Sequence, residues 1–297
     1  MAADLRVALI GLDTSHSIEF ARRMQAPDCP PEHKVAGLRA VSCLRFDTPF
    51  QGREGLDQRQ GQLEAWGVRV TASFDEAVRD SDALMLEIND PAFHVEYFQR
   101  CAALGKPLFL DKPLADTVAA GRSILEVARK AGTRFFSASS LRFVPELEQA
   151  CRRIPRPQTA SFYGPLGKAP AGSSVVWYGV HAFEMLERAM GRGARSVRAL
   201  RDGAGTVAVV DYGERRRGVV ELTEGAYVYG GAVRAERDGA AFAVDMSRAY
   251  TELLRAIGAF LRGGPAPAAP EEALEILALL EATDRSLETG AEQPVRL

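Results

Sequence analysis

The chain has 297 residues, 46% hydrophobic and 26% charged, which is enough for two domains of ordinary size. Its 37 Lys and Arg are offset by 39 Asp and Glu, so no charge excess favours nucleic acid or an anionic membrane as a partner. No stretch approaches the roughly 18 uncharged apolar residues of a membrane span, and a small-molecule substrate is therefore the expected partner.

Two features that the sequence lacks indicate the cellular compartment. The N-terminal segment has neither the basic leader nor the small-residue cleavage site of a secretory signal, so a cytoplasmic location is expected. The cysteines at positions 29, 43, 101 and 151 have no zinc-binding or C-x-x-C spacing, which is typical of small buried hydrophobes in a reducing compartment. We predict no bound metal.

Residues 1–140 alternate between short apolar segments and amphipathic ones. Strands are predicted at 6–12, 38–44, 68–71, 83–88, 107–110 and 134–138, and helices at 18–24, 56–66, 74–78, 94–104 and 117–131. Such alternation indicates a parallel sheet with helices on both faces, so an α/β, doubly wound Rossmann-type domain for dinucleotide binding is predicted.

The turn after the first strand, GLDTSH at residues 11–16, faces the N-terminus of the next helix, where a dinucleotide would bind. Of the three fingerprint glycines only Gly11 is present, and a carboxylate at Asp13 would crowd and repel a pyrophosphate. The other polar groups that could still bind an anion belong to Thr14, Ser15 and His16. Either a nucleotide binds in an altered pose, or Asp13 or Thr14 only caps the helix.

The edge after the second strand carries both Arg45 and Asp47. An acid there would bind the ribose diol of NAD, whereas a basic residue would accommodate the 2′-phosphate of NADP. The sequence leaves the choice between NAD and NADP open.

After Pro145 the pattern changes. Strands are predicted at 159–163, 197–200, 206–212, 218–224 and 232–237, and helices at 181–190, 246–261 and 271–289. Consecutive strands indicate an open, mostly antiparallel sheet, so residues 141–297 are predicted to form an α+β domain for substrate binding and oligomerisation. One face of that sheet would stay uncovered, which favours a homodimer or homotetramer formed through residues 195–245. The charged run 214–217 is more typical of a hairpin turn than of a phosphate-binding patch.

Residues 82–114, DALMLEINDPAFHVEYFQRCAALGKPLFLDKPL, resemble the central stretch of the Gfo/Idh/MocA oxidoreductases, named for glucose-fructose oxidoreductase, inositol dehydrogenase and a rhizopine catabolism protein. The matching positions are Asn89, His94, Gly105-Lys106 and Asp111-Lys112-Pro113. Further on, Gly179-Val180-His181 with Glu184 resembles the family's Gly-x-His-x-x-Asp, and residues 281–297 resemble its closing helix and strand. The resemblance therefore covers nearly the whole chain.

The resemblance implies a catalytic pair. Lys112 would lie against the nicotinamide and the substrate hydroxyl, His181 would exchange the proton, and Asn89, His94 and Asp111 would lie at the cofactor edge. Alcohol oxidation requires a base that titrates near neutrality, as imidazole does, and an ammonium group stabilises the developing alkoxide. Taken alone, each of the pair has an ordinary alternative, an exposed turn lysine and a capping or packing histidine.

Some positions depart from the family pattern. Trp177 stands where family members often have an Asp, so a proton relay would end at His181 or pass to Tyr178 or Tyr163. Trp177 and Tyr178 would line a substrate pocket or pack in the core. Asp111 replaces a Glu and could be a helix-capping or salt-bridged acid, and His94 could pack on its neighbour Phe93.

The sequence thus predicts an NAD(P)-dependent oxidoreductase acting on a secondary alcohol or ketone of a sugar, cyclitol or related polyol. The alternative is a ligand-binding or non-redox member with a rebuilt glycine turn, including a lyase or hydrolase that oxidises its bound cofactor only transiently, since a fold does not dictate an activity.

Overall fold

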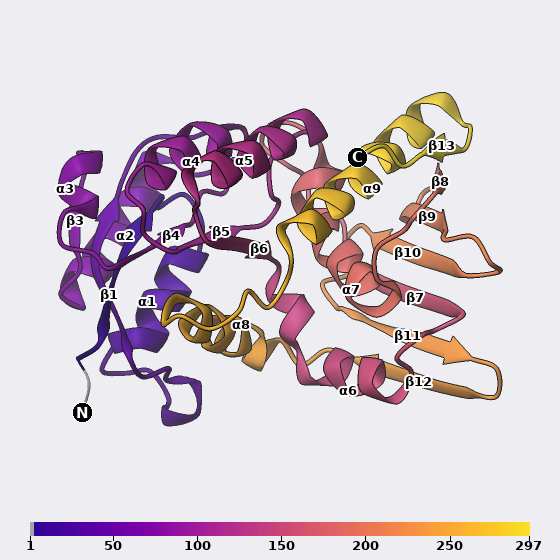
Figure 1. Ribbon diagram of the computed structural model, residues 1–297, viewed down its shortest axis with the longest axis horizontal. Coiled ribbons are helices and arrows are strands. Elements are labelled where there is room, and N and C mark those ends of the chain that lie inside the picture. The colour runs from indigo at the N-terminus through magenta and orange to yellow at the C-terminus, as the bar shows by residue number, and fades with distance from the viewer. Residues whose placement is uncertain (1–2) are drawn as a thin grey trace. The chain divides into compact units, whose positions relative to one another are not determined.

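The computed structural model describes residues 3–297, which form two compact units. The first comprises the chain up to Ala115, together with 122–137 and 250–269, and the second comprises 116–121, 138–249 and 270–297 (Figure 1). The boundary predicted at residue 140 lies near Ser137, but the chain later returns to the first unit. It returns because apolar side chains of 250–269 pack there, with Phe260 against Phe136 at 5.1 Å between ring centroids.

The sheet of the first unit has the predicted doubly wound topology. Its strand order is β3-β2-β1-β4-β5-β6. The strands are β1 (Leu5–Ile10), β2 (Leu38–Leu44), β3 (Arg69–Thr71), β4 (Ala83–Leu86), β5 (Leu108–Asp111) and β6 (Phe135–Ala138). Central strand β1 pairs in parallel with both β2 and β4, and every residue of β4 and β5 is buried, as expected for a sheet covered on both faces.

Helices alternate with these strands as predicted. They are α1 (His16–Gln25), α2 (Arg53–Ala65), α3 (Phe74–Val78), α4 (His94–Ala102) and α5 (Val118–Ala131), and α8 (Met246–Leu261) follows much later in the chain. Helix α1 begins two residues before the predicted start, because Ser17 is buried and donates its hydroxyl to the carbonyl of Gly11 at 2.8 Å. The first turn of the helix is therefore tied directly to the end of β1.

The second unit contains a mixed sheet with the order β12-β11-β7-β10-β9-β8-β13. Its strands are β7 (Thr159–Pro165), β8 (Ser196–Arg201), β9 (Gly205–Asp211), β10 (Arg217–Thr223), β11 (Gly230–Ala235), β12 (Asp238–Ala243) and β13 (Gln293–Pro294). The predicted, mostly antiparallel character is confirmed, and β7 with β10 is a parallel pair. Strand β12 and helix α6 (Pro145–Arg153) were not predicted. The alanine-rich sequence of β12 lacks the large alternating side chains that mark a strand.

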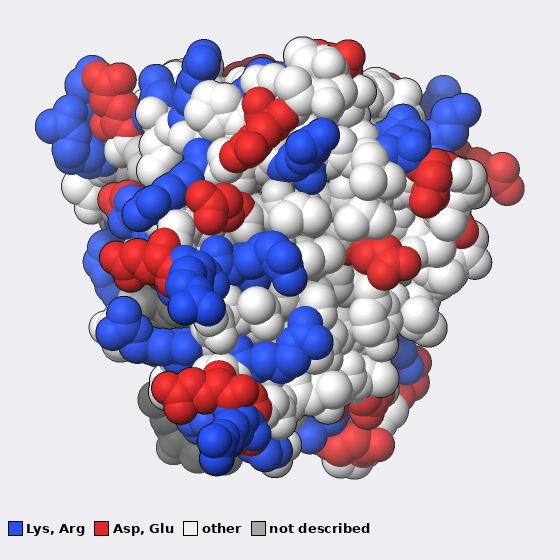
Figure 2. Space-filling model, turned by 90° about the vertical axis from the view of Figure 1, so that its right-hand side faces the viewer, with Lys and Arg blue, Asp and Glu red and all other residues white. Residues whose placement is uncertain are grey.

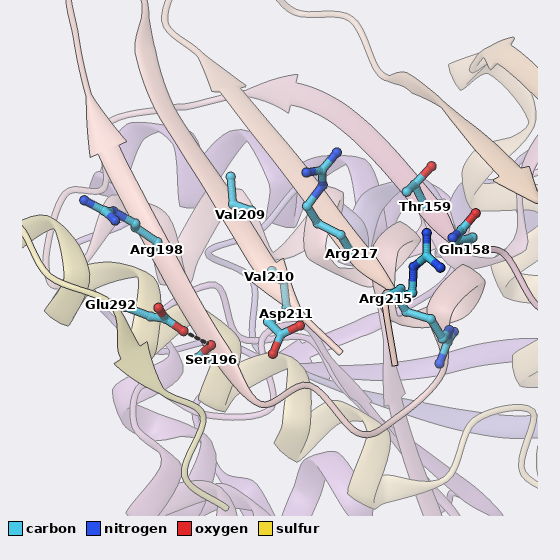
Figure 3. A pocket seen from close by; sticks show the side chains of 11 residues that line it. Gln158, Thr159, Ser196, Arg198, Val209, Val210, Asp211, Arg215, Arg217 and Glu292 are labelled. Atoms are coloured by element: carbon cyan, nitrogen blue, oxygen red, sulfur yellow. Dashed lines mark hydrogen bonds between the residues drawn. The ribbon is translucent and has the colours of Figure 1, made fainter. Parts of the chain in front are cut away.

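The two faces of this sheet differ. Helices α7 (Val180–Met190) and α9 (Pro270–Thr289) cover one face, where Phe162, Val210 and Val220 are buried. The other face carries a hollow of about 600 Å³ lined by both acidic and basic side chains (Figure 3). Charges of both signs separated by uncharged areas also mark the side of the molecule drawn in Figure 2. This sheet is thus open on one face, as predicted.

The charged run 214–217 lies at the β9–β10 hairpin, as predicted. Glu214 and Arg215 have φ of 50° and 63°, and the amide of Arg216 donates to the carbonyl of Gly213 at 2.8 Å. The four cysteines are buried and unpaired, also as predicted. Within residues 3–297, no helix combines the length and the apolar character that crossing a membrane requires.

Candidate functional site

Gly11 makes the sharp turn that ends β1. Its φ is +114°, and a Cβ atom there would lie 2.3 Å from the carbonyl oxygen of Glu87. Its amide donates to the carbonyl of Leu44 at 3.1 Å, so the turn passes closely between the ends of β2 and β4. Only glycine fits this close approach, which is the role that the first fingerprint glycine has in a dinucleotide turn.

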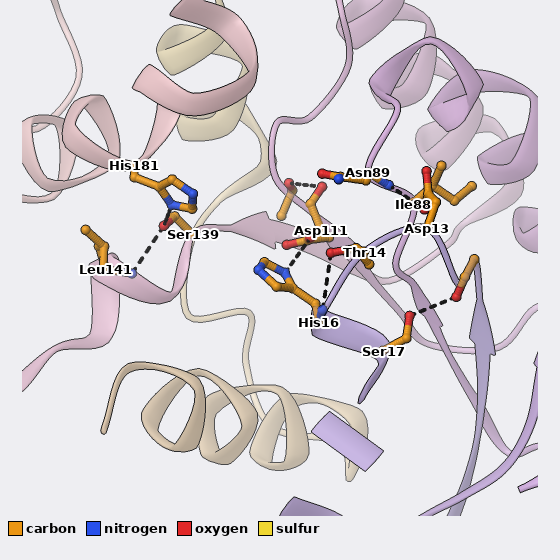
Figure 4. Close-up of polar contacts among 12 residues, drawn as sticks. Asp13, Thr14, His16, Ser17, Ile88, Asn89, Asp111, Ser139, Leu141 and His181 are labelled. Atoms are coloured by element: carbon orange, nitrogen blue, oxygen red, sulfur yellow. Dashed lines mark hydrogen bonds and ion pairs between the residues drawn. The ribbon is translucent and has the colours of Figure 1, made fainter. Parts of the chain in front are cut away.

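The carboxylate of Asp13 points into the loop after β4 (Figure 4). It accepts hydrogen bonds from the amides of Asn89 at 2.9 Å and Asp90 at 3.3 Å, and from the hydroxyl of Thr48 at 2.7 Å. Burial raises the pKa of Asp13, and these hydrogen bonds oppose that rise. The acid therefore crosslinks two loops, and its charge is already compensated by donors. The expectation from the sequence that Asp13 crowds and repels a pyrophosphate considered only its charge and not these hydrogen-bond donors.

The helix cap comes from the neighbouring residue instead. The hydroxyl of Thr14 accepts a hydrogen bond from the amide of His16 at 3.2 Å. Ser15, the N-cap position of α1, makes no side-chain cap bond, and its side chain bonds to Tyr250 of α8. The first turn of α1 follows β1 directly, so the N-terminus of this helix lies at the carboxyl-end edge of the sheet, a position that favours anions.

A buried cluster joins the ends of β4 and β5 to α1. His16 Nδ1 lies 2.7 Å from Asp111 Oδ2, and Glu87 directly follows β4 (Figure 4 shows the ion pair). In the part of the chain that the structure describes, one ligand atom from each of the three residues lies within 4.8 Å of the others. Burial and the charge of Asp111 raise the pKa of Glu87. Burial alone would raise the pKa of Asp111, but His16 and Lys112 lower it to about 2.

Lys112 is not an exposed turn lysine. Only 6% of the residue is exposed, and its charge lowers the pKa of both Asp111 and Glu87. Its peptide bond to Pro113 is cis. The ammonium group therefore belongs to the carboxyl-end edge of the sheet, where ligands of open α/β sheets bind.

The other residues predicted to bind the cofactor lie in different surroundings. Arg45 is held by Asp57 at 2.5 Å and by Gln60 at 2.6 Å, whereas Asp47 is exposed. His94 is completely buried, and its two ring nitrogens face the carbonyls of Leu114 at 3.2 Å and Ile88 at 2.8 Å. These contacts give His94 a structural role in joining two loops.

In the second unit, a short network orients His181 on α7. Its Nδ1 lies 2.7 Å from the hydroxyl of Ser139. Figure 4 draws this contact as a dashed line. The amide of Ser139 donates to Glu184 Oε2 at 3.1 Å, and Arg142 binds Glu184 Oε1 at 2.9 Å. Ser139 thus connects both polar residues of the predicted His-x-x-acid motif. Sequence reasoning missed it, although two adjacent serines follow the last strand of the first unit.

Aromatic rings flank His181. The rings of Tyr178 and Tyr229 lie 5.7 and 5.9 Å from it, and Trp177 stacks edgewise on Tyr178 at 5.2 Å. Tyr229 was not predicted. Tyr163 alternates with buried Phe162 and Gly164 along β7, so it lies on the open face of the sheet, away from α7. The structure therefore brings Tyr178 and Tyr229 to the imidazole and does not bring Tyr163 there.

Comparisons with known proteins agree with this fold. Residues 53–139 match the Gfo/Idh/MocA family, described as an oxidoreductase family with an NAD-binding Rossmann fold. A 75-residue stretch is 36% identical to inositol 2-dehydrogenase of Klebsiella pneumoniae, covering 25% of this chain and 22% of that protein. The structure of scyllo-inositol dehydrogenase from Lactobacillus casei, with bound NAD(H) and scyllo-inositol, aligns with a TM-score of 0.80 and 13% identity over 98% of this chain and 99% of that one. GenD2 from gentamicin A biosynthesis, in complex with NAD, aligns with a TM-score of 0.79 and 16% identity over 100% and 98% of the two chains.

Proposed function

We propose, from the confirmed resemblance to the Gfo/Idh/MocA oxidoreductase family over residues 53–139, that this chain is an NAD-dependent oxidoreductase acting on a secondary alcohol or ketone of a cyclitol, sugar or related polyol. The observation that carries this proposal is that two candidate side chains are held in place by their surroundings. Lys112 is buried at the end of β5, and His181 is held by Ser139. Neither side chain has the surroundings of an ordinary surface residue, and each occupies a position that matches a motif of the family.

The glycine turn is suited to a dinucleotide. Gly11 keeps the tight turn, and the carboxylate of Asp13 is engaged by the amides of Asn89 and Asp90, so it is withdrawn from bound phosphates. The N-terminus of α1 would hold the pyrophosphate by its backbone N–H groups. When bound, the nicotinamide supplies the acceptor for the hydride.

His181 would accept the proton of the substrate hydroxyl. If Nδ1–H donates to the hydroxyl of Ser139, Nε2 is the nitrogen that would serve as the base. Because Glu184 accepts a hydrogen bond from the amide of Ser139, this serine is held in place and fixes the imidazole ring. Tyr178 and Tyr229 supply flat apolar surface beside the ring, which suits the C–H face of a polyol.

Lys112 would stabilise the alkoxide that forms as the proton leaves. A buried ammonium group is a preorganised positive charge and costs little reorganisation during the reaction. We propose that Lys112 acts by its charge and His181 by proton transfer.

Nucleotide titration combined with a double-mutant cycle tests the proposal. The purified chain is titrated with NADH and NADPH by fluorescence, and oxidation of myo-inositol and scyllo-inositol is followed by nicotinamide absorbance. We expect Lys112→Met and His181→Asn each to lower kcat/KM by about 100-fold or more, with NADH affinity retained. The double variant should lose less than the product of the single losses, because both groups act in one step.

Two outcomes would contradict the proposal. Failure to bind either nucleotide would remove the oxidoreductase function altogether. Independent, multiplicative losses would show that Lys112 and His181 do not act on one step. Retention of a bound nucleotide through turnover, without net reduction, would instead indicate the non-redox alternative.

A further inference from the structure

We propose that His16, Glu87 and Asp111 form the protein part of a binding site for one divalent transition-metal ion, of the Zn²⁺, Mn²⁺ or Fe²⁺ class. This proposal does not rest on the oxidoreductase function, because the three residues suffice to define the site. It revises the prediction of no bound metal, which considered cysteine spacing alone. The ligands instead come from three segments that are distant in sequence.

The donor set is compact. A histidine nitrogen and two carboxylate oxygens lie within 4.8 Å of one another, close enough for small side-chain movements to bring them around one central ion. Ordinary bond lengths for such an ion are about 2.0–2.2 Å. Imidazole favours Zn²⁺ or Fe²⁺ and carboxylates favour harder ions such as Mn²⁺, so the mixed set selects a borderline divalent ion. Mg²⁺ and Ca²⁺, which prefer oxygen ligands only, fit less well.

The surroundings of Glu87 independently point to a cation as its partner. It is 0% exposed, and neither of its carboxyl oxygens has a hydrogen-bond partner among the described residues. Burying a carboxyl group without a hydrogen-bond partner is unfavourable, and more so when the group is ionised. Coordination to a cation would satisfy both oxygens at once. The three residues are thus more than a group of acids that happen to be close.

The position of the cluster also favours a ligand. Glu87 follows β4 and Asp111 ends β5, while His16 begins α1 after β1, so the site lies at the carboxyl edge where the strand order reverses between β1 and β4. This switch point is where open α/β sheets bind ligands. Two carboxylates and a divalent ion are neutral together, whereas two carboxylates alone repel each other.

Metal binding can be measured on the full-length, untagged chain without nucleotide. After dialysis against EDTA, the protein is equilibrated with ZnCl₂, MnCl₂ or CoCl₂ and analysed by mass spectrometry for bound metal. We expect one ion per chain. Because even loss of a group that supports a ligand weakens metal binding about 10–100-fold, Glu87→Gln and His16→Gln should each weaken it by at least about 100-fold.

The matched control is Glu187→Gln, which removes another buried glutamate whose oxygens have no hydrogen-bond partner in the described residues, outside this cluster. It should retain the ion. If the cluster variants do not fold, the visible absorption of Co²⁺ in the unaltered chain decides: d–d bands without thiolate charge transfer are expected. The proposal is overturned if the unaltered chain binds none of the three metals, or if Glu87→Gln binds them as tightly as Glu187→Gln. Loss of the dinucleotide site would change neither readout.

Discussion

At the scale of single residues, Gly11 is a position with no room for a side chain. Both a positive φ and the carbonyl of Glu87 exclude a side chain there. We expect Gly11→Ala to lower the free energy of unfolding by more than about 2 kcal/mol, because the clash adds to the backbone strain. Urea unfolding followed by circular dichroism measures the loss.

Gly105 provides the matched control. Its φ is +65°, but a Cβ atom there would meet nothing within 4 Å. Gly105→Ala should therefore cost only the strain of a left-handed backbone, about 1–2 kcal/mol. Equal losses at the two positions would contradict the close contact between Gly11 and Glu87.

Cofactor choice also belongs to this scale. Arg45 is already bound to Asp57 and Gln60, so a 2′-phosphate would have to compete for its guanidinium group. We expect tighter binding of NADH than of NADPH. Asp57→Ala should shift the ratio of the two dissociation constants toward NADPH by up to about fivefold, the value of one exposed ion pair. Glu54→Ala, on the same helix, is the control, and an unchanged ratio in Asp57→Ala would exclude a role for this pair.

At the scale of elements, the segment before His181 is the most unusual. Residues 175–179 form a π-helical turn that leads directly into α7. Such turns are rare and are often found at functional sites, because the extra residue displaces the side chains that follow. Here the turn contains Trp177 and Tyr178 and precedes His181, so it sets the direction of all three side chains.

Helix α7 also carries a buried acid that makes stability depend on pH. Burial, and next the charge of Glu275, raise the pKa of Glu187 to about 8. The other charged or titratable groups that act on Glu187 or respond to it are Arg142, Glu184, Arg192 and Tyr212. Its carboxyl group is therefore protonated in the fold at pH values where it ionises in the unfolded chain.

The sign follows from linkage. Between about pH 4.5 and 8 the folded chain holds a proton at Glu187 that the unfolded chain has lost, so stability falls as pH rises through this window. Glu187→Gln should remove a slope of up to about 1.4 kcal/mol per pH unit. Urea unfolding at several pH values tests this, and an unaltered slope in the variant would contradict the raised pKa.

At the scale of the whole molecule, the open face of the second sheet predicts self-association. Leu200 and Val209 are 57% and 38% exposed on this face, among side chains of both signs such as Arg198, Asp211 and Arg217. A surface with both signs can pair with a copy of itself across a two-fold axis. We expect a homodimer or a dimer of dimers formed through this face.

Light scattering at micromolar concentration tests the association. Val209→Arg should produce monomers, because it places a charge at the centre of the interface. Leu104→Arg changes a similarly exposed apolar residue, 36% exposed, in the first unit and should leave the assembly intact. Monomeric behaviour of the unaltered chain would remove this prediction.

The sequence by itself determined most of the elements and their order. Helices 74–78 and 246–261 and strand 38–44 were predicted with the observed bounds, because their signals of apolar periodicity and flanking polar residues are local. The order of motifs likewise predicted the resemblance to the family over residues 53–139 and singled out Lys112 and His181 as candidates. Strand β12 was missed, since its small side chains leave no alternating pattern to detect.

Only the tertiary structure decided which polar groups meet. Glu87 lies within an apolar segment that predicts burial, but nothing local shows that its partners are His16 and Asp111. From the sequence, the effect of Asp13 on the glycine fingerprint could be predicted only from its charge. The backbone amides that compensate this charge belong to residues 76 and 77 positions away in the chain. Local periodicity encodes which segments form, but the neighbours of a buried charge depend on how strands distant in sequence are placed side by side.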